Sequence, residues 1–248
     1  MNEFYINEDG LRLHAKLEKP EGADKCPLLI LIHGLTGNME ETHILGIKDA
    51  VLSAGIAVLR VEMYGHGQSE GSFSEHTILR WVTNAMTVTD YAQSLEFVTD
   101  LYLGGHSQGG LLTMIAGGIR PDAYKAIIPL SPGISIVDGA KRGRKAGFPF
   151  DSENIPDELY FKGLRMSGNW ARTAKLINMD EVIAGYPGPV LLVHGDIDET
   201  VPVSYSIEAA AKYKNAKLEI IPGDTHCYDN HLDQVKETVK EFLLSLPE

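Results

Sequence analysis

The alternation of apolar and polar residues divides this chain into short strands and helices that follow one another. Residues 3–7 and 11–18 lie on either side of Glu8-Asp9-Gly10, a turn signal, and predict a hairpin. A continuous apolar run at 27–32 has the pattern of a strand buried on both faces. The same pattern predicts strands at 56–61, 101–105, 126–130, 189–193 and 217–221, and helices at 42–54, 77–95, 111–118, 204–213 and 231–246. Strands that alternate with helices imply an α/β fold with a mostly parallel sheet and helices on both faces.

The alternation of predicted strands and helices stops between residues 132 and 186, where basic, glycine and aromatic residues follow no clear pattern. The segment is too long for a bare connection between two elements. We therefore expect a core of residues 1–131 and 187–248 and an inserted lid at 132–186, over the strand ends where ligands bind in open sheets. Aromatic lid residues, Tyr160 and Trp170 among them, are candidates for lining a binding site. The alternative is that they only fix the lid to the body.

Composition narrows the class of partner. The chain has 248 residues, which suits one α/β domain with an insertion. It carries 34 acidic and 22 basic residues, a net charge of −12, so it lacks the positive surface that DNA, RNA or an anionic membrane requires. No apolar run approaches the roughly 20 residues of a membrane-spanning helix. We expect a small, neutral or weakly charged substrate, and no nucleic-acid or membrane partner.

The cysteines and the N-terminal residues indicate the cellular compartment. Cys26 and Cys227 cannot form a disulfide framework or a zinc motif, and we expect both to be reduced thiols. The sequence at 1–5 lacks the basic start and apolar core of a signal peptide, which predicts a cytoplasmic protein. A homodimer is compatible with the sequence, which contains no interface signal.

The strongest chemical signal is Gly105-His106-Ser107-Gln108-Gly109, between a predicted strand and a predicted helix. This is the G-x-S-x-G pattern of a nucleophile elbow, in which the serine stands at the tip of a sharp turn. Glycines on either side leave room where a β-carbon would clash. Such a pentapeptide also recurs by chance, as a structural turn. A catalytic serine needs a base, an acid and oxyanion donors, with the triad in the order Ser, acid, His.

The predicted base is His226, which follows the last strand and precedes the last helix. An imidazole suits both halves of acyl transfer, because its ordinary pKa of about 6.5 is close to working pH. A lone histidine is more often structural, but chain order and loop position favour His226. His231 begins the last helix and fits a surface or capping role. His106 adjoins Ser107 in a tight turn, where neighbouring side chains diverge.

Two aspartates follow the penultimate strand, in Gly195-Asp196-Ile197-Asp198. Asp198 stands three residues after the glycine and precedes an apolar residue and a proline, the usual arrangement of the acid in this fold. Its role would be to hold the tautomer of His226 and stabilise the imidazolium. Asp196 fits a local role, in which it ties its own loop together by hydrogen bonds.

The oxyanion hole needs two backbone donors near the serine. The amide of Gln108 lies just before the predicted helix, at its N-terminal end, and His33-Gly34-Leu35 follows the first long strand, where a second donor is expected. We predict that the amides of Leu35 and Gln108 form this hole and that His33 braces the loop. The alternative for His33-Gly34 is a simple turn.

Taken together, these segments resemble the α/β-hydrolase superfamily and, within it, the cinnamoyl (feruloyl) esterases of gut bacteria. The segments that carry the resemblance are His33-Gly34-Leu35-Thr36-Gly37, Tyr64-Gly65-His66-Gly67, Gly105-His106-Ser107-Gln108-Gly109-Gly110, Gly195-Asp196-Ile197-Asp198, Gly223-Asp224-Thr225-His226-Cys227 and, in the lid, Asn154-Ile155-Pro156-Asp157. The resemblance implies an eight-stranded, mostly parallel sheet with an inserted lid, and the triad Ser107, Asp198 and His226.

The resemblance also implies a substrate. Feruloyl esterases hold the phenolic ring of a hydroxycinnamate under the lid, where a carboxylate or a tyrosine contacts the phenol hydroxyl. Asp138 lies near the matching carboxylate position, and Trp170 stands where the family can carry tyrosine. With Tyr160, these are the predicted substrate-binding residues. The implied activity is a serine carboxylesterase for hydroxycinnamoyl esters that uses neither metal nor organic cofactor.

Two other functions remain open from the sequence. A generalist short-chain or monoacylglycerol esterase, a lipase or a peptidase could use the same fold, because function depends on the site. A sensor that binds a phenolic ligand on a hydrolase scaffold is disfavoured by the complete set of triad residues.

Overall fold

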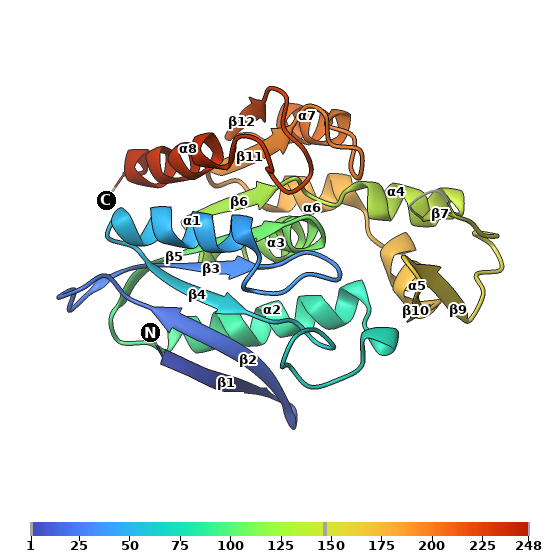
Figure 1. The fold of residues 1–248 in the computed structure, drawn as a ribbon, viewed down its shortest axis with the longest axis horizontal. Coiled ribbons are helices and arrows are strands. Elements are labelled where there is room, and N and C mark those ends of the chain that lie inside the picture. Colours follow the sequence, from blue (N-terminus) through green and yellow to red (C-terminus); the bar gives the residue numbers. More distant parts are fainter. Residues whose placement is uncertain (1, 146–147, 248) are drawn as a thin grey trace.

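The computed structural model describes residues 2–145 and 148–247, and its centre is one large sheet (Figure 1). Within that part of the chain the sheet has eight strands in the order β1-β2-β4-β3-β5-β6-β11-β12. Their bounds are β1 Asn2–Glu8, β2 Leu11–Glu18, β3 Cys26–Ile32, β4 Ala57–Val61, β5 Val98–His106, β6 Ala126–Leu130, β11 Val190–Gly195 and β12 Ala216–Ile221. The strand β2 pairs antiparallel with β1 and β4, and from β4 to β12 all pairs are parallel. The predicted fold class, an eight-stranded and mostly parallel sheet, is confirmed.

Helices cover both faces of this sheet, because successive residues of a buried strand point in opposite directions. In β3, Leu28, Ile30 and Ile32 belong to one apolar core, while Leu29 and Leu31 belong to the other. The helices α1 (Thr42–Ser53) and α8 (Leu232–Ser245) pack on the second core. The first core lies under α2 (Ile78–Gln93), α3 (Gln108–Ile119) and α7 (Ser204–Lys212). Two short 3₁₀ turns, η1 (Phe73–Glu75) and η2 (Pro121–Ala123), lie before α2 and after α3.

The segment between β6 and β11 projects beyond the carboxyl ends of the strands (Figure 1). Its elements are α4 (Ser135–Arg142), β7 (Arg144–Lys145), β8 (Phe148–Pro149), β9 (Glu158–Phe161), β10 (Leu164–Ser167), α5 (Asn169–Lys175) and α6 (Met179–Gly185). Two antiparallel hairpins, β7–β8 and β9–β10, are among them. The predicted lid, 132–186, also spans residues 146–147, which lie outside the described residues.

The last helix of this segment, α6, belongs to the body of the fold. It packs against α3 so closely that a β-carbon on Gly118 would lie 2.6 Å from the carbonyl oxygen of Val182. The elements that project over the strand ends therefore come before α6. None of the described helices is both long and apolar enough to cross a membrane.

Candidate active site

Ser107 occupies the turn between β5 and α3 in a backbone conformation that non-glycine residues rarely adopt. Its φ of 56° and ψ of −117° carry strain of about 1–3 kcal/mol, which the surroundings must hold in place. The amide of Ser107 donates to the carbonyl of Leu130 (2.9 Å), and its own carbonyl accepts from the amide of Gly133 (2.7 Å). A β-carbon at Gly109 would lie 2.4 Å from the carbonyl oxygen of His33, so only glycine allows this approach. The turn has the geometry of a nucleophile elbow.

Three predicted residues meet at this turn. Nε2 of His226 lies 2.9 Å from Oγ of Ser107, and Nδ1 of His226 lies 2.6 Å from Oδ2 of Asp198. Because a carboxylate only accepts, Nδ1 of His226 carries the hydrogen and Nε2 is left to accept the proton of the serine hydroxyl. The side chains come from the loops after β5, β11 and β12, which end at the same edge of the sheet. The arrangement can perform nucleophilic acyl transfer.

Asp198 is buried and surrounded by donors. Burial by itself would raise the pKa of Asp198, but the hydrogen bonds from His194 and His226 outweigh it and hold that pKa well below its ordinary value. The other carboxylate oxygen accepts from the amides of Thr200 (2.7 Å) and Val201 (2.8 Å). Asp198 is therefore a carboxylate across the neutral pH range.

The two predicted oxyanion donors lie next to the serine. Gln108 is the first residue of α3, where the amides have no partner within the helix and the dipole favours negative charge. Leu35 lines the same cavity as Ser107. A β-carbon on Gly34 would lie 3.1 Å from Cβ of Ser107, which shows how closely this loop approaches the nucleophile. Between described residues, no backbone hydrogen bond uses the amide of Leu35 or Gln108.

Two buried histidines brace the loop that contains Leu35. Nε2 of His33 accepts from the amide of Met63 (3.1 Å), and Nε2 of His66 accepts from the amide of Thr36 (3.2 Å). Each ring donates through Nδ1 to a nearby backbone carbonyl. Burial lowers the pKa of His33 to about 3 and also lowers the pKa of His66. Both rings are therefore neutral at pH 7, which they must be in order to accept a hydrogen bond through Nε2.

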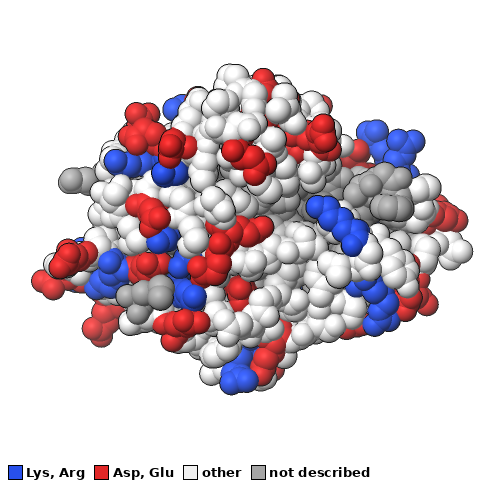
Figure 2. Space-filling model, viewed as in Figure 1, with Lys and Arg blue, Asp and Glu red and all other residues white. Residues whose placement is uncertain are grey.

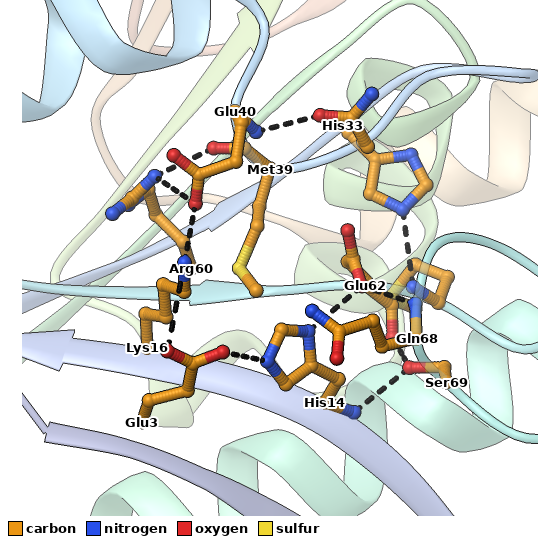
Figure 3. A network of polar contacts seen from close by, with 12 residues as sticks. Glu3, His14, Lys16, His33, Met39, Glu40, Arg60, Glu62, Gln68 and Ser69 are labelled. Atoms are coloured by element: carbon orange, nitrogen blue, oxygen red, sulfur yellow. Dashed lines mark hydrogen bonds and ion pairs between the residues drawn. The ribbon is translucent and has the colours of Figure 1, made fainter.

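From the sequence, His33 was predicted to brace the loop that contains Leu35. No role was predicted for His66, although the segment Tyr64-Gly65-His66-Gly67 is among those that carry the family resemblance. The loop that carries His66 is built on a buried carboxylate (Figure 3). Oε2 of Glu62 accepts from the amide of Gln68 (2.6 Å) and lies 2.8 Å from Nδ1 of His14. The hydroxyl of Ser69 donates to the carbonyl of Glu62 (2.5 Å). Through His66, this polar network supports the loop that contains Leu35, the predicted oxyanion loop.

A cavity of about 250 Å³ opens beside Ser107. Ile136, Phe161 and Trp170 give it an apolar side, and basic groups lie among its other lining residues. The indole of Trp170 is almost fully buried and donates to Oε1 of Gln108 (3.0 Å), which ties α5 to the elbow. Figure 2 shows acidic and basic side chains spread over this face, with both charged and uncharged side chains around the hollow near its middle. The cavity has room for a small organic group and offers it both apolar and polar side chains.

Of the predicted substrate-binding residues, the structure brings only Trp170 to this cavity. Asp138 accepts from the hydroxyl of Tyr205 (2.7 Å), pairs with Arg142 (2.9 Å) and lines a separate cavity of about 220 Å³. Ile136 of the same helix lines the catalytic cavity, and two further residues rotate a helix by about 200°. Asp138 therefore points to the other side of α4.

Tyr160 also lies outside the cavity. Its side chain is 56% exposed, and its hydroxyl donates to Glu158 (3.1 Å). Phe161, the next residue of the same strand, lines the cavity, and successive residues of a strand face opposite sides. The predictions that Asp138 and Tyr160 contact the substrate are not supported by this arrangement.

The other histidine, aspartate and cysteine residues considered from the sequence lie outside the Ser107–His226–Asp198 hydrogen bonds. Asp196 accepts from the amide of Gly223 (2.6 Å), so it ties its loop to a loop 27 residues away and not, as predicted, to itself. His106 lies within hydrogen-bond distance of the carbonyl of His226 (2.8 Å), and burial holds the pKa of His106 well below its ordinary value. His231 is exposed and immediately precedes α8. Cys26 and Cys227 are unpaired, and Cys227 lines the catalytic cavity.

Comparison with known proteins places this site in a family. A family model described as serine aminopeptidase, S33, matches residues 23–158. The structure of Est1E from Butyrivibrio proteoclasticus with bound ferulic acid superposes with a TM-score of 0.96 at 49% identity, over 98% of each chain. The chain belongs to the feruloyl esterase family of the α/β-hydrolases. It is a serine esterase, a carboxylic ester hydrolase, and the predicted family is confirmed.

More distant relatives act on other acyl groups. The chain is 25% identical to the palmitoyl-protein thioesterase ABHD10 of Rattus norvegicus, over 89% of this chain and 73% of the relative. It is 27% identical to the lysophosphatidylserine lipase ABHD12 of Danio rerio, over 88% of this chain and 58% of the relative. At such identities a shared fold does not imply a shared substrate.

Proposed function

We propose that this serine esterase hydrolyses esters of hydroxycinnamic acids. The observation that carries the proposal is the near full-length similarity to Est1E, which has been solved with ferulic acid bound. At 49% identity the two chains share more than a fold, in contrast to the relatives at about 25%.

The cavity supports an aromatic acyl group over a long aliphatic one. Its volume of about 250 Å³ falls just below the roughly 300–1,000 Å³ of typical ligand pockets. A feruloyl group is flat, and the rings of Trp170 and Phe161 offer it apolar faces.

The proposed reaction follows the order of the hydrogen bonds. Oγ of Ser107 attacks the ester carbonyl while Nε2 of His226 takes its proton, and Asp198 stabilises the imidazolium that forms. The amides of Leu35 and Gln108 hold the oxyanion. The C–O bond to the alcohol then breaks, and His226 returns the proton to the leaving oxygen. Water attacks the acyl-enzyme by the same route and releases the acid and free Ser107.

An ester panel with the purified protein tests the substrate class. Methyl ferulate is compared with p-nitrophenyl butyrate and with an acyl-peptide by kcat/KM. The proposal expects methyl ferulate to exceed the acyl-peptide by several orders of magnitude and the butyrate by at least tenfold. A Ser107→Ala control should lose more than about 10³-fold in kcat and still fold.

A second candidate is an acyl hydrolase of broad range, which the ABHD10 and ABHD12 relatives favour. Adding a palmitoyl thioester and a monoacylglycerol to the panel separates the two candidates. Equal kcat/KM for all the esters would support the generalist and end the proposal of hydroxycinnamate preference.

A further inference from the structure

His194, in β11, contacts Asp198 from outside the proposed triad. Its side chain is fully buried, and Nε2 lies 3.0 Å from Oδ2 of Asp198 and 2.9 Å from the carbonyl oxygen of Val201. Because both of these atoms only accept, Nε2 carries a hydrogen that it shares between them. Nδ1 lies 2.7 Å from Oγ of Ser206, a buried residue of α7, and is within hydrogen-bond distance of that hydroxyl.

The hydrogen bond from His194 reaches the oxygen that also accepts from His226. Oδ2 of Asp198 thus takes two imidazole donors, while Oδ1 takes two backbone amides. Four donors occupy the acceptor positions of a carboxylate, so Asp198 has one orientation and needs no water. Burial would raise the pKa of Asp198, and the bond from His194 is the strongest influence that lowers it.

We propose that His194 is a positioning residue for the catalytic triad, which fixes the orientation and charge of Asp198 and thereby sets the pH range in which His226 acts as the base. This inference rests on the proposed roles of Ser107, Asp198 and His226. His194 does not touch the substrate, so its effect should appear in kcat and in the pH profile.

The direction of the pH effect follows because His194 and His226 both donate to Oδ2 of Asp198. Without the donor on His194, the charge of Asp198 is less dispersed and stabilises the imidazolium of His226 more strongly. The acid limb of kcat/KM is therefore expected to move to higher pH. The other titratable groups that face His226 or Asp198 stay in place in such a variant: Glu41, His43, His106, Cys227 and Tyr228.

Two amide variants at this position form a matched pair. The amide of glutamine in His194→Gln reaches the position of Nε2 and can still donate to Asp198. The amide of asparagine in His194→Asn ends near the position of Nδ1 and can pair only with Ser206. Both variants keep a buried polar group, and they differ by one methylene in reach.

With methyl ferulate, we expect His194→Asn to lower kcat about 10- to 100-fold with little change in KM, the effect of losing one hydrogen bond to a buried charge. Its acid limb should move up by roughly half a pH unit or more. His194→Gln should keep kcat within about fivefold and leave the acid limb in place. Thermal unfolding and titration with a fluorophosphonate give the folded, active fraction of each variant.

Several results would overturn the positioning role. Equal losses in both variants with an unmoved acid limb would leave His194 only a packing role, and a loss beyond about tenfold in His194→Gln would also count against it. Wild-type protein without activity on methyl ferulate is a failure of the proposed substrate instead. The same comparison is then made with p-nitrophenyl butyrate, which tests His194 independently of the acyl group.

Discussion

Acidification should destabilise this protein steeply, because burial lowers the pKa of four histidines in the described part of the chain. Burial lowers the pKa of His33 to about 3 and of His43 to about 4, and it lowers the pKa of His66 and, most strongly, of His106. In the unfolded chain each ring titrates near its ordinary value of about 6.5. Below that pH the unfolded state binds more protons, so the free energy of unfolding falls as the pH falls.

The magnitude follows from the number of protons. Each histidine that stays neutral in the fold contributes up to about 1.4 kcal/mol per pH unit, and three to four of them give about 4–6 kcal/mol per unit below pH 6. A domain of ordinary stability, about 5–15 kcal/mol, would then unfold near pH 5. Asp198 adds to the loss only below about pH 4, because its pKa is lowered. Glu41, whose pKa burial raises, acts weakly in the opposite direction.

Urea unfolding followed by tryptophan fluorescence at a series of pH values from 8 to 5 measures this slope. His43→Leu is the matched control, because Nε2 of His43 has no hydrogen-bond partner among the described residues. The variant should be at least as stable as the wild type at pH 8 and should lose about one proton from the slope. A slope below one proton in the wild type, or an unchanged slope in His43→Leu, would refute the reasoning.

Three substitutions test the local geometry. Gly109→Ala places a β-carbon 2.4 Å from the carbonyl oxygen of His33 and should lower the free energy of unfolding by at least about 2 kcal/mol in urea; an unchanged midpoint contradicts this. His66→Phe frees the amide of Thr36 and should lower kcat about tenfold with an unchanged KM; a change in KM alone would rule out a role in the oxyanion loop. Trp170→Phe loses the indole N–H and should raise KM for methyl ferulate about fivefold in initial-rate measurements. An unchanged KM would exclude a role of this indole in substrate binding.

The sequence predicted the sheet best where the apolar pattern was strongest. The run at 27–32 became β3, with its residues divided between the two cores as a doubly buried strand requires. The start of α3 was predicted three residues too late, at 111 instead of Gln108. Gly109 and Gly110 resemble turn residues, but they lie inside the helix. Glycine is needed at both positions because the neighbouring backbone leaves no room for a β-carbon.

The lid was the least predictable part. Its strands have only two to four residues, too few to establish a period. The rotational phase of α4 decides whether Asp138 or Ile136 faces the catalytic cavity, and a position in the sequence does not fix that phase. Motif spacing located Ser107, Asp198 and His226 because their chain order is constrained. His194 and His66 carry no such constraint, since an isolated histidine in a strand or loop is most often structural.

The proposed reaction requires Ser107 to form a covalent acyl intermediate, and intact-protein mass spectrometry tests this most directly. Wild-type protein mixed with p-nitrophenyl ferulate and quenched with acid within milliseconds should carry one added feruloyl group, and peptide mapping should locate that group on Ser107. Ser107→Ala should carry none under the same conditions. A feruloyl group on another residue, or a burst of p-nitrophenol with no covalent adduct, would contradict the account.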